Sequence, residues 1–390
     1  MNNIRYKLRG LGYAEVGDDI WLANLYFNAL IKINKSSGQI QLIEKFPNYD
    51  IYQGWLYSTV FHVDGYLVFI PNTSEEILVY HLKTQRFQSM VLDGKKIGTK
   101  KTYFVNAYVY NHYIYLFPTG AKCIVRYDVS THSVKYLENR LSALIRTWPE
   151  TRYCFYQQFE VIDTKIYVPF LDLNAVAVFD LEDESVEIRH LEIEGGCSTI
   201  KYVDGFFYLA SWSVPQIYRW NIEKDEIKTY DGFLSSNVEK NLFLYSCQVE
   251  DKLLFFPEHC KAVMSLSLKT GEIKEEKRIY NEDTEPLKTF FVQKEKDTSY
   301  ILTADMGEIS SFEYKENKLS FSPYYHMDNP YNKKMIQNYL DENGYCEVLY
   351  EEENSLDEYL EQVSMSDKVK ITKRDKNCGK DIFGEARKRA

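Results

Sequence analysis

Hydrophobic and polar residues alternate along most of the chain in short runs, and this period of two is typical of β-strands. In STVFHVDGYLVFIP, at 58–71, one run leads into the turn VDG and a second run leaves it. The phrase returns as VDGFFYLAS at 203–211. Equivalent turns end at residues 19, 65, 112, 164, 205, 251 and 297, at spacings of 46, 47, 52, 41, 46 and 46 residues. The sequence therefore predicts seven repeats with a period near 46.

Each repeat contains the pattern of four strands. After the two strands that flank the turn, a third alternates apolar and polar residues and ends in a polar turn such as KTGE, at 269–272. A shorter fourth strand follows, as in SVKYLE at 133–138. Proline ends four of the second strands, because it has no N–H to give to the ladder; these prolines are Pro71, Pro118, Pro169 and Pro257. Four antiparallel strands at this period, repeated seven times, are typical of a β-propeller.

Between about residue 9 and residue 325 the pattern resembles the broad kelch-like and quinoprotein-like group of propellers. The resemblance implies an all-β, seven-bladed propeller of four-stranded antiparallel blades, and it supplies no functional residues. The single Gly-Gly pair of the chain is Gly195-Gly196, and the Gly-His and Trp-Asp pairs of WD40 blades do not occur. Two segments compete to complete the seventh blade, namely KLSFSPY at 318–324 and NIRYKL at 3–8.

The pattern divides the chain into a propeller at 1–325, a helical C-terminal extension at 326–367 and a basic tail at 368–390. Within NKKMIQNYLDENG, at 332–344, apolar residues share one helical face; they are Met335, Ile336, Tyr339 and Leu340. Residues 340–367 hold ten Asp or Glu and no Lys or Arg, whereas 368–390 carry a net charge of +6. We favour an amphipathic cap on the propeller followed by a solvated tail; the alternative is a basic arm for an anionic partner.

Composition narrows the classes of function. Hydrophobic residues make up 45% of the 390 and aromatic residues 15%, which favours a large core built from sheets. The net charge of −10 disfavours nucleic acid as a partner. No apolar run is long enough for a membrane span, and the start, MNNIRYKLRGLGY, predicts no secretory leader. Seven cysteines without CxxC or zinc spacing indicate buried apolar residues in a reducing compartment. We therefore expect a cytoplasmic monomer without a metal or other cofactor.

The predicted strand order places the connections of each blade on two faces. The long connections, at 45–57, 93–103, 137–153 and 230–243, share one face, here named the loop face; the tight turns share the opposite turn face. Loops on a rigid scaffold commonly carry function, so we expect one asymmetric site at the mouth of the central channel on the loop face. The candidate ligand-binding residues are Asn72, Asn106, Arg146, Trp148, Arg152, Gln157, Asp172, Trp212, Glu258, His259 and Asp305.

The longest departure from the repeat is YLENRLSALIRTWPETR, at 136–152. Its apolar residues follow helical spacing and predict a short amphipathic helix; they are Leu141, Leu144, Ile145 and Trp148. In one interpretation this helix walls the site and brings Arg146 and Arg152 to an anionic or hydrogen-bonding ligand. In the other it caps the groove between blades three and four.

The function predicted from these features is a binding or scaffold module for a peptide, a protein or a glycan. The alternative is a carbohydrate-active enzyme, a glycan hydrolase or lyase, with carboxylates and a histidine around the channel mouth doing acid–base work; these are Asp172, Glu258, His259 and Asp305. No GxSxG, HExxH, phosphate-loop or dinucleotide fingerprint occurs. Whether the protein is an enzyme stays open at this point, and no catalytic residue is assigned.

Overall fold

The computed structural model describes residues 8, 10–98, 102–148, 153–231, 243–257, 262–278, 289–295, 299–304, 308–315, 318–323 and 329–345. The chain divides into two units, 1–345 and 346–390, and all described residues belong to the first. The predictions made for the acidic stretch beyond residue 345 and for the basic tail lie outside the described residues.

Seven antiparallel sheets of four strands each account for the strands of the described chain. The first strands are β1 (Tyr13–Val16), β5 (Tyr57–Val63), β9 (Phe104–Tyr110), β13 (Glu160–Ile162), β17 (Cys197–Val203), β21 (Phe243–Val249) and β25 (Thr289–Glu295). The second strands are β2 (Asp19–Ala23), β6 (Tyr66–Pro71), β10 (Tyr113–Pro118), β14 (Lys165–Pro169), β18 (Phe206–Ser211), β22 (Lys252–Pro257) and β26 (Ser299–Ala304). The third strands are β3 (Leu30–Asn34), β7 (Glu76–His81), β11 (Ile124–Asp128), β15 (Ala175–Asp180), β19 (Ile217–Asn221), β23 (Ala262–Ser267) and β27 (Glu308–Lys315). The fourth strands are β4 (Ile40–Glu44), β8 (Arg86–Val91), β12 (Ser133–Leu137), β16 (Val186–His190), β20 (Glu226–Tyr230), β24 (Ile273–Arg278) and β28 (Lys318–Pro323).

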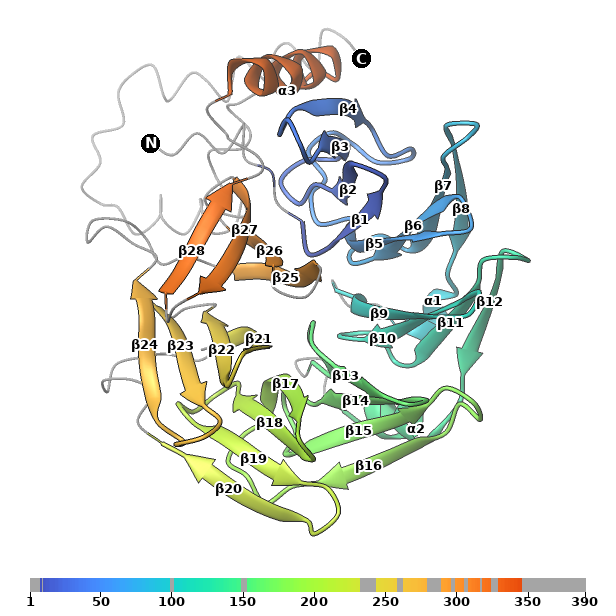
Figure 1. Cartoon of the computed structure of the whole chain (residues 1–390). Coiled ribbons are helices and arrows are strands. Elements are labelled where there is room, and N and C mark those ends of the chain that lie inside the picture. Colours follow the sequence, from blue (N-terminus) through green and yellow to red (C-terminus); the bar gives the residue numbers. More distant parts are fainter. Residues whose placement is uncertain are drawn as a thin grey trace, which may run out of the picture. The chain divides into compact units, whose positions relative to one another are not determined.

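The sheets follow one another around a centre, with the first strand of each innermost and the fourth at the rim (Figure 1). This arrangement confirms the predicted seven-bladed propeller. Every blade consists of four consecutive strands, and β28 completes the seventh, which decides between the two segments proposed for that position. Of the competing segment, NIRYKL, only Leu8 is among the described residues.

The turns that defined the repeat have a shared backbone geometry. In the first six blades the first central residue of the inner hairpin has a φ between 48° and 63°; these residues are Gly17, Asp64, Asn111, Asp163, Asp204 and Glu250. Gly, Asn and Asp tolerate this left-handed region best, and such turns match the twist of antiparallel strands. The polar turn residues thus repeat in the sequence because the hairpin requires them.

Apolar clusters between neighbouring blades form the core. One cluster joins Val68 and Ile77 of blade 2 to Leu116 and Val125 of blade 3. Comparable clusters join blades 1 and 2, 3 and 4, 4 and 5, 5 and 6, and 6 and 7. A sheet that lies between two other sheets therefore buries both of its faces. This explains why its second and third strands consist of nearly continuous apolar residues.

Charged side chains also connect neighbouring blades. The carboxylate of Glu184, in blade 4, lies 2.5 Å from both the guanidinium of Arg126 and the ammonium of Lys135, in blade 3. Lys201 Nζ of blade 5 lies 2.7 Å from Glu160 Oε1 of blade 4. Burial raises the pKa of Glu160, and the Lys201 ammonium opposes that rise.

Glu276 connects blades 6 and 7 through the hydrogen bonds of its carboxylate. Its carboxylate accepts hydrogen bonds from Lys252 Nζ at 2.8 Å, from Ser265 Oγ at 2.5 Å and from the Tyr314 hydroxyl at 3.2 Å. Burial alone would raise the pKa of Glu276, but the hydrogen bonds and the Lys252 ammonium outweigh it and hold the pKa below its ordinary value.

The four cysteines within the described part of the chain, Cys123, Cys154, Cys197 and Cys247, are free and buried, as the sequence predicted for them. Burial raises the pKa of the Cys123 thiol to about 12. These thiols pack as small apolar side chains.

A helix after the last blade covers the first blade. Helix α3 (Pro330–Glu342) begins at the cap Asn329 and ends before Asn343, in close agreement with the predicted 332–344. Its buried face consists of Ile336, Tyr339 and Leu340, and it packs in one cluster with apolar residues of blade 1. Figure 1 shows α3 lying beside β4. Among the described side chains, α3 and Leu8 thus cover the face of blade 1 that blade 2 leaves open.

Polar contacts fix the position of α3. The buried side chain of Asn332 donates to the carbonyl of Gly38 at 2.9 Å and accepts from the amide of Ile40 at 2.9 Å. The Tyr339 hydroxyl donates to the carbonyl of Asn28, and Tyr52 stacks on Tyr345 with ring centroids 5.2 Å apart. Asn332 therefore forms hydrogen bonds with backbone groups at the edge of β4, as a further strand would.

Replacing Asn332 by alanine tests this contact. Asn332→Ala leaves the Gly38 carbonyl and the Ile40 amide without partners, so we expect a loss of about 2 kcal/mol in the free energy of unfolding. Asn338→Ala, on the exposed side of the same helix, should cost less than about 0.5 kcal/mol. Urea unfolding of both variants measures the difference, and equal losses would contradict the docking of α3 through Asn332.

The hydrogen bonds of the Glu276 carboxylate predict that the stability of the fold depends on pH. Because its folded pKa is lowered, the stabilisation by Glu276 is complete above the ordinary value of 4.5 and is lost as the pH falls through the folded pKa. Glu276→Gln should therefore cost about 2 kcal/mol at pH 7, and the difference from the parent protein should shrink at more acidic pH.

The matched control is Glu272→Gln in the same blade, where the carboxylate pairs with Lys274 at 3.1 Å in an exposed position. This variant should stay within about 0.5 kcal/mol of the parent at every pH. A Glu276→Gln difference that is independent of pH would show that the carboxylate is not the stabilising form.

Candidate functional site

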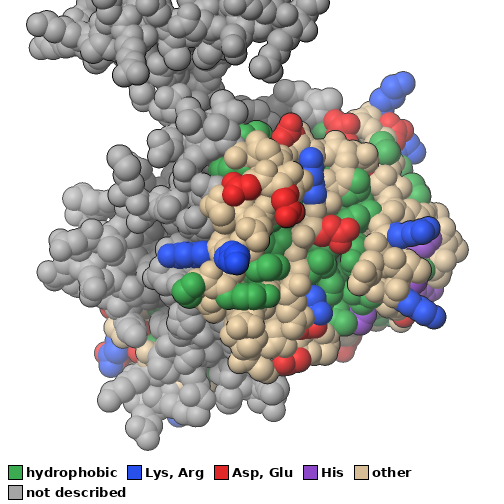
Figure 2. Space-filling view, turned by 90° about the horizontal axis from the view of Figure 1, so that it is seen from above, with side chains coloured by type: hydrophobic (Ala, Val, Ile, Leu, Met, Phe, Trp, Pro, Cys, Tyr) green, Lys and Arg blue, Asp and Glu red, His purple; other side chains and the backbone are tan. Residues whose placement is uncertain are grey.

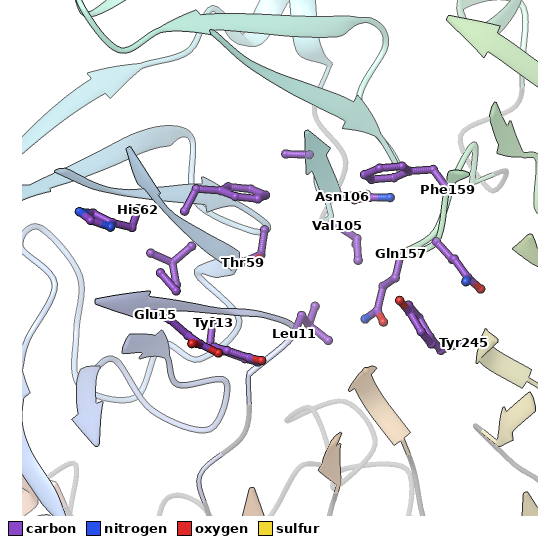
Figure 3. A pocket seen from close by; sticks show the side chains of 15 residues that line it. Leu11, Tyr13, Glu15, Thr59, His62, Val105, Asn106, Gln157, Phe159 and Tyr245 are labelled. Carbon is purple, nitrogen blue, oxygen red and sulfur yellow. The ribbon is translucent and has the colours of Figure 1, made fainter. Parts of the chain in front are cut away.

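The inner strands enclose a cavity of about 440 Å³ within the channel (Figure 3). It lies among β1, β5 and β9, the segment 157–159 that precedes β13, and Tyr245 of β21. The residues that line it are Leu11, Tyr13, Ala14, Glu15, Thr59, Val60, Phe61, His62, Val105, Asn106, Ala107, Gln157, Gln158, Phe159 and Tyr245. The lining combines aromatic rings and carboxamides with aliphatic side chains.

The geometry of the inner strands explains why these side chains meet. The inner strand of each blade has a partner strand on one side only, so its other edge faces the channel. Blades 1 and 2 approach closely at this point. A Cβ atom at position 12 would lie 2.0 Å from Thr59 Oγ1. Glycine at position 12 thus allows the chain leading into β1 to pass beside β5.

The inner strands also carry polar residues that already have partners. Ser58 Oγ donates to the carbonyl of Ile70 at 3.3 Å, and Ser198 Oγ donates to the carbonyl of Phe243 at 2.6 Å. These hydroxyls satisfy buried backbone groups, so their presence in the channel has a structural explanation.

Gln158 reaches from blade 4 to blade 6. Its Nε2 donates to the carbonyl of Ser246 at 2.6 Å, and its Oε1 accepts from the amide and the hydroxyl of Ser246 at 2.9 and 3.0 Å. One side-chain amide therefore satisfies both backbone groups of a residue 88 positions away. This bridge holds the segment 157–159 inside the channel, where it forms one wall of the cavity.

Asn106 and Gln157 differ from their neighbours. Nδ2 of Asn106 and both Nε2 and Oε1 of Gln157 are buried, and none has a hydrogen-bond partner within the described part of the chain. In Figure 3 the Gln157 side chain extends into the space between Leu11 and Tyr245. An amide buried without any partner costs about 1–3 kcal/mol, so these groups are expected to pair with water or with a ligand in the cavity. Both were candidates from the sequence, and the structure brings them into one cavity.

Three other candidates lie outside the cavity lining. The backbone of Asn72 pairs with Leu56 and Tyr103, and its buried Oδ1 has no partner among the described residues. Asp172 Oδ2 accepts from the amide of Tyr153 at 2.9 Å. The Trp212 ring lies 5.6 Å from that of Tyr156. Asp172 is exposed and Trp212 half-buried, so both remain candidates for contacts around the cavity.

The predicted helix of the 136–152 segment is α2 (Arg140–Arg146), which Asn139 and Ser142 cap. Its buried residues join the apolar cluster between blades 3 and 4, and Trp148 lies 5.7 Å from the Phe170 ring. Arg146 pairs with Glu138 at 2.5 Å. These contacts favour the capping interpretation of α2 and bring neither Arg146 nor Trp148 to the cavity lining.

The last four candidates, Arg152, Glu258, His259 and Asp305, lie outside the described residues. Sequence reasoning missed the aromatic part of the lining, which consists of Tyr13, Phe61, Phe159 and Tyr245. The sequence did contain a signal for these residues, because they occupy the inner strands or the segment leading into an inner strand. The sequence alone did not distinguish residues facing the channel from residues packed between blades.

Charged groups are few around the cavity. Of the residues that the structure describes, its lining contains Glu15 and His62 and no Lys or Arg, and Glu15 pairs with Lys35 at 2.8 Å. Within the described ranges, no group of three His, Cys, Asp or Glu side chains is arranged to hold a metal ion.

On the face seen in Figure 2, acidic and basic side chains of the described residues are interspersed rather than gathered by sign. None of the described helices is long and apolar enough to cross a membrane.

Comparisons with known proteins support the fold and no specific family. No family model and no curated protein matches the chain. Virginiamycin B lyase of Staphylococcus aureus, in a catalytically inactive form with quinupristin, has a TM-score of 0.59 at 13% identity over 80% of this chain and 97% of its own. PorZ of the Porphyromonas gingivalis type-IX secretion system has a TM-score of 0.52 at 10% identity, over 82% of this chain and 38% of its own. Hsv2 of Kluyveromyces lactis has a TM-score of 0.50 at 7% identity, over 80% and 97%. These similar structures include an enzyme, so the fold does not decide between catalysis and binding.

Two adjacent glutamines test the description of the cavity. Gln158→Ala removes three hydrogen bonds to Ser246, and we expect a loss of about 2–3 kcal/mol in the free energy of unfolding. Gln157→Ala removes amide atoms that have no partner among the described residues, so the protein should be as stable as the parent or more stable. Thermal and urea unfolding measure both, and a large loss in Gln157→Ala would show that its amide is paired inside the protein.

Proposed function

We propose that this protein is a binding propeller that takes a ligand into its channel cavity from the loop face. The observation that carries the proposal is that Nδ2 of Asn106 and both amide atoms of Gln157 are buried in one cavity without partners among the described residues. The cavity volume of about 440 Å³ falls in the range of roughly 300–1,000 Å³ typical of ligand sites. Its aromatic walls and convergent hydrogen-bonding groups are the features such sites share.

The chemistry of the lining narrows the ligand class. Two carboxamides offer donors and an acceptor, and the described residues of the lining include no Lys or Arg to bind an anionic group. An uncharged ligand rich in hydrogen-bonding groups can pair with these carboxamides. Peptides, protein segments and glycans are ligands of this kind. The half-buried Trp212 and the exposed Asp172 would contact the parts of a larger partner that remain outside the cavity.

The alternative of a carbohydrate-active enzyme rests on carboxylates and a histidine that the described residues do not bring together. Asp172 already accepts a backbone hydrogen bond, and Glu258, His259 and Asp305 lie outside the described ranges. The lyase among the similar structures contributes its fold and no reaction. We therefore place binding ahead of catalysis.

The proposal includes a monomer in a reducing, cytoplasmic compartment. The free, buried cysteines of the described chain support the reducing environment, since such thiols persist where disulfides do not form. Size-exclusion chromatography with light scattering tests the monomer.

The proposal predicts that cavity variants lose binding while the fold is retained. A glycan array and an array of short random-sequence linear peptides would first be probed with the parent protein. Asn106→Leu/Gln157→Leu removes three hydrogen-bonding atoms and should weaken binding to the recovered ligands about 150-fold, since each lost hydrogen bond contributes about 1 kcal/mol. Isothermal titration calorimetry measures the change.

A variant of the turn face provides the control. Lys83→Glu/Lys269→Glu changes exposed charges on the turn face, and it should bind like the parent protein. Binding that survives the cavity variant and disappears in the turn-face variant would show that the functional face was assigned wrongly.

A further inference from the structure

Carboxamide side chains in this protein pair repeatedly with both backbone groups of a neighbouring segment. Asn28 donates to the carbonyl of Phe46 at 3.1 Å and accepts from its amide at 3.0 Å. Gln158 does the same with Ser246, and Asn332 does so with Gly38 and Ile40. A carboxamide suits this task because its donor and acceptor have the geometry of a peptide group.

Gln157 presents the same pair of atoms to the cavity. Its Nε2 and Oε1 are both buried and without partners among described residues, one position before the paired Gln158. A ligand that satisfies both atoms at once must carry a donor and an acceptor side by side. A peptide residue does so with its N–H and C=O, as Ser246 shows for Gln158.

The rest of the cavity favours a peptide chain over other neutral ligands. The strands β1, β5 and β9 each have one edge without a partner strand in their sheets, and these edges surround the space. Exposed strand edges bind extended peptides through main-chain hydrogen bonds. Among the described lining residues there is no Lys or Arg for a terminal carboxylate, and Glu15 is already paired with Lys35. These facts favour an internal segment rather than a charged chain end.

We propose that the ligand of the cavity is the main chain of an extended peptide segment. Gln157 binds this segment through both backbone groups of one of its residues. Nε2 of Gln157 donates to that residue's carbonyl, and Oε1 accepts from its amide. Nδ2 of Asn106 donates to a second carbonyl of the same segment. The aromatic rings of Tyr13, Phe61 and Tyr245 contact the peptide's side chains. This inference rests on the proposed function and specifies its ligand class.

Main-chain recognition predicts a particular response to changes in the peptide. The probe is a fluorescein-labelled peptide selected from the random linear array on the parent protein. N-methylation of the residue that pairs with Gln157 removes its N–H and should weaken binding at least tenfold in fluorescence anisotropy. Alanine at the same position keeps the N–H and should change binding less than threefold.

A double-mutant cycle separates Gln157 from other contacts. Gln157→Leu should bind the unmodified peptide at least tenfold more weakly and should no longer distinguish it from the N-methylated form. Gln88→Leu, on the exposed fourth strand of blade 2, is the matched control and should keep the full N-methyl effect.

The outcomes distinguish this inference from the proposed function. If the array yields glycans and no peptides, and the Asn106→Leu/Gln157→Leu variant loses them, the binding site stands and the peptide inference is overturned. If peptides bind but Gln157→Leu retains the N-methyl effect, the main chain is not read by Gln157. If the cavity variant binds every recovered ligand like the parent protein, both fail.

Discussion

The structure depends on one constraint: a blade sheet has two apolar faces, and only a neighbouring element can cover each of them. Clusters such as that of Val68 and Leu116 bury these faces at successive boundaries. Every blade is made of four consecutive strands, and among the described strands none is shared between the first and last blades. The described contacts instead bring α3, which follows the last blade, onto blade 1 through Ile336, Leu340 and the Asn332 side chain. Helix α3 therefore supplies across a boundary the burial that a shared strand would otherwise give.

The same constraint creates the channel. When sheets are covered on both faces, the unpaired edges of their first strands must point inward, where the backbone still requires hydrogen bonds. Serine hydroxyls and the Gln158 amide meet part of this requirement on the side of blades 4 to 6. The cavity lies beside blades 1 to 3, where Nδ2 of Asn106 and the amide of Gln157 have no partner among the described residues. Among the described residues, the segment 157–159 thus contributes both a paired amide, Gln158, and an unpaired one, Gln157, to the channel.

The similar structures illustrate how little the propeller fold says about activity. A lyase, a secretion-system component and Hsv2 share the architecture at identities of 7 to 13%. Function in such proteins comes from the side chains placed at the channel and on the loops. In the described part of this chain, the cavity is a place where several buried polar groups lack partners. On α2, in contrast, Arg146 pairs with Glu138 and the apolar face packs between blades.

The sequence by itself determined the features that depend on near neighbours in the chain. Strand alternation, left-handed turn residues such as Asp64 and Asp204, and the apolar face of α3 are local, so seven blades and a docked helix could be predicted. Polar residues of the inner strands could be named, but not sorted into paired and unpaired. That distinction depends on contacts such as Gln158 with Ser246, 88 residues apart, and Asn332 with Ile40, 292 residues apart. Only the tertiary structure decided it, because the partner of a buried amide is set by which blades the ring brings together.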